Sequence, residues 1–142
     1  MFLPERGSVL KYGRHVVDVH LPSKGEEETP VPTQWRDVLS QVVDSLARKD
    51  AVLARDVGEV DPVSDQVRQQ CLEAVEDYGG VDLVALPQET WETSVASWRG
   101  RSWSCLVDLW TLQEGRSDLV MMVEVRESQG RYRFVPIMVY VP

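Results

Sequence analysis

The last 52 residues of the chain, Trp91 to Pro142, constrain its fold most strongly, because apolar and polar side chains alternate along them. Alternation with a period of two is typical of strands that bury one face. Residues 103–111, 119–126 and 132–141 each show this pattern. The residues Gly115 to Asp118 are typical of a tight turn between the first two of these segments. This part of the chain therefore predicts a run of antiparallel strands, and four of the five tryptophans fall within it.

Two shorter strands are predicted before this run, at residues 81–86 and 90–98. The last strand contains Pro136, which has no backbone N–H to donate to a neighbouring strand. We therefore expect Pro136 to mark either a bulge or an edge of the sheet.

Two earlier segments carry apolar side chains at helical spacing. Residues 35–47 place seven apolar side chains on one face of a helix. A second stripe runs over residues 67–78, and either Ser64 or Asp65 is suited to cap its start by accepting hydrogen bonds from free backbone amides. Gly79, followed by another glycine, ends this helix because glycine adopts the left-handed conformation without steric cost.

This order of elements predicts an α+β fold, in which two N-terminal helices pack on a curved antiparallel sheet of four to five strands. The result is a two-layer sandwich or, with stronger curvature, a cone around a pocket. Residues 22–32 contain three prolines and three consecutive glutamates, which is the composition of a solvated linker. We therefore expect residues 1–31 to form an N-terminal extension and linker, and residues 32–142 to form a single α+β domain.

The net charge of −8 comes from 15 basic and 23 acidic side chains. Because the basic residues are scattered, the chain lacks the clustered Lys and Arg that bind a polyanion, and we expect no nucleic-acid partner. No apolar run approaches the length of a membrane span, which is about 20 residues, so we expect no membrane partner. Residues 1–6 lack the apolar core of a secretory signal, so we expect a cytoplasmic location. Cys71 and Cys105 are then expected to be buried free thiols.

Asp108 is the main candidate for chemistry, because a carboxylate within an apolar strand is costly unless it has a partner. It would act either as a general base in a pocket or, as we favour, in an ion pair with Arg116, Arg126 or an arginine of the last strand. Asp118 follows a serine and is suited to a structural role in the expected turn. Trp98 and Trp110 are candidates for aromatic anchors at a protein interface. The predicted binding residues are Trp98, Asp108, Trp110, Arg116 and Asp118.

The sequence indicates neither a metal site nor a cofactor. His15 and His20 are five residues apart, so their side chains point to different sides of either a strand or a helix. No phosphate-binding loop, zinc motif or nucleophile elbow occurs. We therefore expect a protein that is not an enzyme, with Asp108 as the weak catalytic candidate.

Four segments are similar to a known family: Pro32 to Arg36, Leu86 to Glu92, Val107 to Thr111 and Gly115 to Leu119. They resemble small bacterial proteins that carry a domain of unknown function, and the resemblance covers about residues 31–142. It implies no activity and no functional residue. The order of helices and strands is also similar to the cone fold of nuclear transport factor-like and cystatin-like proteins, which implies an architecture but no function.

These observations leave two main hypotheses for function. In the first, the chain is a small acidic protein-binding module for a basic protein partner, either of the toxin-neutralising (immunity) type or regulatory. In the second, it is a cone-fold binder of a small molecule or an acid–base enzyme that uses Asp108. Self-association through sheet faces or edges is a third possibility.

Overall fold

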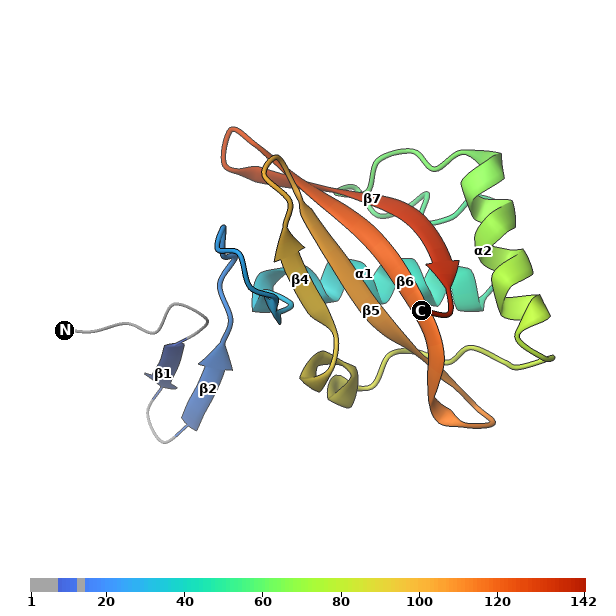
Figure 1. Ribbon diagram of the computed structural model, residues 1–142, viewed down its shortest axis with the longest axis horizontal. Coiled ribbons are helices and arrows are strands. Elements are labelled where there is room, and N and C mark those ends of the chain that lie inside the picture. Colours follow the sequence, from blue (N-terminus) through green and yellow to red (C-terminus); the bar gives the residue numbers. More distant parts are fainter. Residues whose placement is uncertain (1–7, 13–14) are drawn as a thin grey trace.

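A five-stranded antiparallel sheet in the order β3-β4-β5-β6-β7 forms the centre of the protein, with α1 behind it and α2 beside β7 (Figure 1). The structure is a computed structural model that describes residues 8–12 and 15–142. The α+β class and the antiparallel sheet are confirmed. Residues 1–6, on which the expected absence of a secretory signal rests, lie outside the described residues.

The two helices are not N-terminal, which corrects the expected order of elements. Three strands precede them: β1 (Ser8–Tyr12), β2 (His15–Val19) and β3 (Thr29–Pro30). β1 and β2 pair with each other as an antiparallel hairpin, whereas β3 pairs with β4 in the main sheet. The main sheet therefore begins at Thr29, and the core begins with the fully buried Val31.

The sheet continues with β4 (Val95–Trp98), β5 (Trp103–Thr111), β6 (Gly115–Ser128) and β7 (Arg131–Tyr140). Along β5 every second side chain is buried, as the alternation predicted. The pairing of β6 with β7 shifts register beside Pro136, and β7 is also the last strand of the sheet. Pro136 therefore lies both at a bulge and on an edge strand.

The helix α1 (Arg36–Ala47) follows the short 3₁₀ helix η1 (Thr33–Trp35) and covers the inner face of the sheet. The ring of Trp35 meets that of Trp103 edge to face, with centroids 5.2 Å apart. The buried side chains of α1 continue this inner layer of the core after Trp35, because they recur at helical spacing on one face. They are Val38, Leu39, Val42, Val43, Ser45 and Leu46.

The helix α2 (Asp65–Asp77) begins at Ser64, whose hydroxyl accepts from the backbone N–H of Val67 at 3.1 Å. The expected N-cap is therefore confirmed, with Ser64 rather than Asp65 as the capping residue. The helix ends just before Gly79, which has a φ of 121°. The sequence signals at both ends of α2 are local, which explains why they could be interpreted correctly.

In the second half, one expected strand and one expected turn were wrong, and another expected strand was too long. Residues 81–86 do not form a strand, although Leu83 makes one isolated bridge to Thr111. The first part of the segment 90–98 belongs to the 3₁₀ helix η2 (Gln88–Glu92), so that β4 is only four residues long. The expected turn at 115–118 is part of β6, because the chain already reverses at residues 112–114.

No helix in the described part of the chain is both long enough and apolar enough to cross a membrane.

Candidate binding surface

The sheet has one face that α1 covers and one outer face over which no helix or strand lies in Figure 1. Register pairs place partly buried apolar side chains of four strands next to one another on this outer face: Val95 on β4 faces Leu106 on β5, which faces Met122 on β6, which faces Met138 on β7. Together with Trp110, Val120, Val135 and Tyr140 they form what we call the outer apolar face.

The charged side chains on this face are balanced in sign. Three carboxylates and four guanidinium groups project from its strands; Arg126 is bonded to Glu124, and Arg133 is bonded to the carboxylate of Asp61 beside β7. The residues on the strands are Asp108, Asp118, Glu124, Arg116, Arg126, Arg131 and Arg133, and with Asp61 there are four charges of each sign. The outer face is therefore not the acidic surface that the net charge of −8 suggested.

Asp108 lies where β4 and β5 diverge, and three hydroxyl groups surround it. Its backbone N–H donates to Ser94 Oγ at 2.9 Å, and its carbonyl accepts from Thr90 Oγ1 at 2.7 Å. Its carboxylate accepts from Thr93 Oγ1. These hydroxyls replace the backbone partners that a neighbouring strand would supply, because the pairing of β4 with β5 stops at Leu106.

The expected ion pair of Asp108 with an arginine was wrong. Among the described residues, the ion pairs of Arg126 and Arg133 are with Glu124 and Asp61. The hydroxyl of Thr93 is the side-chain partner of Asp108 instead. These hydrogen bonds connect Asp108 to the segment before β4, at the point where the two strands separate.

Four of the five predicted binding residues share the outer face near the β5–β6 hairpin. Trp110 and Asp108 project from β5, and Arg116 is the register partner of Trp110 on β6. Asp118 is exposed on β6, where its backbone N–H donates to the hydroxyl of Tyr78 at 3.1 Å. Asp118 therefore joins this hairpin to the end of α2.

Trp98 lies apart from these four residues. It is the register partner of Trp103, and the two ring centroids are 4.6 Å apart. The ammonium of Lys24 lies 5.1 Å from the centroid of the Trp98 ring. The half-buried Trp98 thus closes one end of the inner core and does not contribute to the outer apolar face.

The acidic surface of the protein is formed by α2 and the segments on either side of it. Residues 59–92 hold nine acidic side chains and one basic side chain, whereas residues 93–142 hold five acidic and six basic side chains. All nine acidic side chains are exposed except that of Asp61, which is half-buried. No sequence motif marks this concentration of charge, although the count of charges along the sequence shows it.

Two hollows with apolar residues and acidic rims flank α2. One, of about 480 Å³, lies between α2, the end of α1 and residues 80–83; Leu72 and Val75 line it together with Glu76 and Asp82. The other, of about 490 Å³, lies between α2 and β7, and its lining combines Leu119, Val139 and Val141 with Glu73 and Asp77. Such hollows fit the aliphatic stem and the cationic end of a Lys or Arg side chain.

The end of α2 carries charges of the wrong sign for its own stability. Glu76 and Asp77 lie in its last turn, which contains no basic residue. The C-terminal end of a helix dipole is negative, so each carboxylate there costs about 0.3–1 kcal/mol. Residues that lower the stability of their own helix in this way often belong to a functional site.

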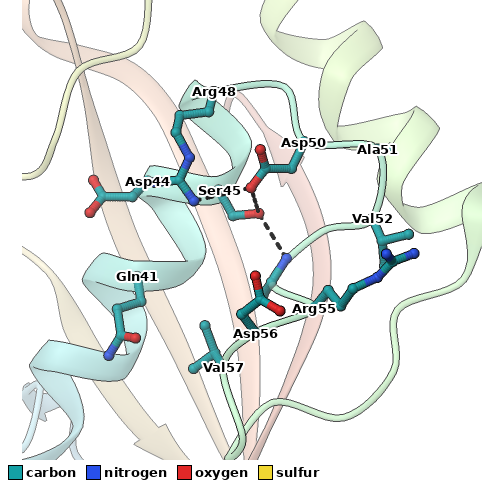
Figure 2. Close-up of a pocket in the computed structure, with 11 residues that line it drawn as sticks. Gln41, Asp44, Ser45, Arg48, Asp50, Ala51, Val52, Arg55, Asp56 and Val57 are labelled. Atoms are coloured by element: carbon teal, nitrogen blue, oxygen red, sulfur yellow. Dashed lines mark hydrogen bonds and ion pairs between the residues drawn. The ribbon is translucent and has the colours of Figure 1, made fainter.

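A third hollow, of about 540 Å³, lies beside the end of α1 (Figure 2). Ser45 Oγ accepts from the backbone N–H of Ala54 at 2.8 Å and donates to the Asp50 carboxylate at 3.1 Å. Arg48 also donates to this carboxylate, at 3.0 Å. The hydrogen bonds from Arg48 and Ser45 hold the pKa of Asp50 below its ordinary value. These groups hold one another in place and thereby fix the loop that follows α1.

Within residues 8–12 and 15–142, no group of three His, Cys, Asp or Glu side chains is placed to hold a metal ion.

Comparison with known proteins gives one match. A family model described as "Domain of unknown function (DUF7668)" matches residues 43–142, which is more than half of the chain. The match begins within α1, so it contains three of the four segments that carried the resemblance, and Pro32 to Arg36 lies outside it. No curated protein and no solved structure matches the chain.

Proposed function

From the premise that this chain belongs to the family with the DUF7668 domain of unknown function, we propose that it is a protein-binding module whose α2 surface receives a basic protein partner. The observation that carries the proposal is the concentration of charge: nine acidic side chains and one basic side chain in residues 59–92. A surface of one sign speeds association with a partner of the opposite sign and excludes partners of the same sign.

The hollows beside α2 supply apolar contact area, which charge alone does not provide. Exposed ion pairs contribute little affinity, typically about 0–1 kcal/mol each. Apolar side chains such as Leu72 and the exposed Val141 give a partner area to bury next to the carboxylates. A Lys or Arg side chain that lies in either hollow would therefore gain both burial of its stem and a nearby opposite charge.

The finer form of this proposal is a protein that neutralises a basic toxin or regulates a basic partner by covering its cationic surface. The small size of the chain, its charge of −8 and the acidic surface of α2 support this form. An acidic protein that covers the cationic site of its partner competes with an anionic substrate for that site and thereby inhibits the partner.

The alternative is a cone-fold binder of small molecules, or an enzyme that uses Asp108. In such a protein the ligand would lie between helix and sheet. Here that space holds the packed side chains of Trp35, Leu39 and Trp103, each at most 2% exposed. Asp108 lies on the opposite face, and its carboxylate is bonded to Thr93. Both observations favour the binding module.

Two double variants of equal charge test the proposal. Glu73→Lys with Asp77→Lys reverses charge on α2, and Glu26→Lys with Glu28→Lys makes the same change in net charge at exposed positions before β3. Each protein and the wild type would be cross-linked in a lysate of the source cells, and the partners identified by mass spectrometry at low and high salt.

We expect one basic protein to be captured by the wild type and by the control variant, but not by the α2 variant, with capture decreasing as salt increases. Equal capture by both variants would refute the α2 surface as the binding site. A small molecule that copurifies with the wild type, in the absence of any basic partner, would favour the alternative.

A further inference from the structure

The outer apolar face remains unexplained by binding at α2. Its central side chains, Leu106, Met122 and Met138, are only partly buried and lie on three adjacent strands. Ile137, the extra residue at the bulge of β7, is 37% exposed beside them. A contiguous apolar area on a sheet face is typical of an interaction surface rather than of ordinary solvent-exposed structure.

The charges on this face decide what can cover it. A strongly basic partner would gain little here, because the four carboxylates, including that of Asp61, are matched by four arginines. A second copy of this chain carries a charge of −8 and would be repelled at most approaches. At the outer face this repulsion is small, because this face carries no excess of either sign.

The arrangement of these charges also suits a symmetric pair. Arg116 and Asp118 lie towards one end of β6, and Glu124 and Arg126 lie towards the other. If two copies meet with a two-fold axis across the strands, each end of one face lies over the opposite end of the other. Each end then offers both a carboxylate and a guanidinium to its counterpart, as the self-complementarity of a two-fold interface requires.

We propose that the outer apolar face binds the same face of a second copy, forming a two-fold symmetric dimer in which two sheets pack face to face. Leu106, Met122 and Met138 form the centre of the interface, and the balanced charges form its rim. The acidic surface of α2 lies beside β7 at the edge of the sheet, so the dimer presents two such surfaces (Figure 1).

Substitutions at the centre of this face test the proposal in the full-length protein. Sedimentation equilibrium of the wild type should give twice the mass of one chain at tens of micromolar. Leu106→Glu and Met122→Glu should each raise the dissociation constant of the dimer by about tenfold or more, because like charges are then juxtaposed. Leu21→Glu is the control, since Leu21 is 48% exposed and lies outside the sheet.

A mixing experiment separates repulsion from misfolding. Leu106→Glu and Leu106→Lys chains should each be monomeric alone, with the circular dichroism of the wild type, and should form dimers when mixed. A wild type that stays monomeric at these concentrations would overturn the proposal. So would dimers that persist in both glutamate variants, because the interface would then lie elsewhere.

Discussion

The side-chain amide of Gln70 on α2 pairs with both backbone groups of Val139 on β7. Its Nε2 donates to the Val139 carbonyl at 2.7 Å, and its Oε1 accepts from the Val139 N–H at 3.0 Å. Further along the same edge, Phe134 exchanges two backbone hydrogen bonds with Glu59 and Asp61, both at 2.9 Å. An open sheet edge invites pairing with other chains, so these contacts protect β7 as well as anchor α2.

Gln70→Ala should lower the free energy of unfolding by about 1–3 kcal/mol, because it leaves a backbone donor and a backbone acceptor without partners. Gln66→Ala is the control, since Gln66 is exposed on the same helix. Urea denaturation of both variants measures the difference. Equal stability of the two would show that water replaces the amide without cost.

Leu39→Ala should lower the free energy of unfolding by about 2–5 kcal/mol, as other large truncations in packed cores do. Leu39 is 1% exposed between α1 and the inner face of the sheet. Thermal or chemical denaturation provides the measurement. A loss below about 0.5 kcal/mol, the range of surface substitutions, would contradict the packing of α1 on the sheet.

Lys49→Gly should stabilise the protein by up to about 1 kcal/mol, because a residue with a side chain pays for the left-handed conformation and glycine does not. Lys49 has a φ of 56° after the end of α1, where its N–H donates to Leu46 and the N–H of Asp50 donates to Ser45. Ala47→Gly, within the helix, should have the opposite sign and cost about 0.5–1 kcal/mol. Denaturation midpoints compare the two, and a loss for both variants would contradict the expected strain.

Asp77→Lys should raise the stability by about 0.3–1 kcal/mol while it weakens binding of a basic partner, because it replaces an unfavourable charge at the negative end of the α2 dipole. Asp65→Lys, in the first turn of the same helix, should lower the stability by a similar amount. Differential scanning calorimetry at low salt measures both effects. Equal changes in the stability of the two variants would indicate a response to net charge rather than to the helix dipole.

The thiols of Cys71 and Cys105 should not react in the native protein at pH 8. Burial raises the pKa of Cys71 to about 11 and that of Cys105 to about 12, so both stay protonated, and the thiolate is the reactive form. Titration with a thiol reagent should detect two thiols only after denaturation. Rapid reaction of either thiol in the folded protein would show local opening of α2 or of β5.

Elements with strong local signals could be predicted from the sequence. The alternation over residues 103–111 matches β5, the start of α2 follows from the cap at Ser64, and both cysteines are buried. The turn was misplaced at 115–118 because Ser117 looks like a turn residue. In the structure its hydroxyl donates to the carbonyl of Leu109 at 2.8 Å, within the pairing of β5 with β6.

The candidate binding surface, like the fold, could be predicted from the sequence only in part. Sequence placed Asp108 and Trp110 on one strand face correctly, because positions two apart share a face in a regular strand and β5 keeps this alternation along its whole length. It could not show that the carboxylate of Asp108 would be bonded to Thr93, 15 residues earlier in the chain. It also could not show that four strands would bring Val95 and Met138 onto the same uncovered face.

The sequence by itself determined the α+β class, the start and end of α2, the alternation of β5 and the uneven distribution of charge. These properties depend on residues close together in the chain, whose spacing alone decides which face they occupy. Only the tertiary structure decided that Gln70 covers the β7 edge, that α2 forms an acidic surface between two hollows, and that the outer face is apolar and balanced in charge. Each of these depends on pairing between distant segments, which local preferences do not encode.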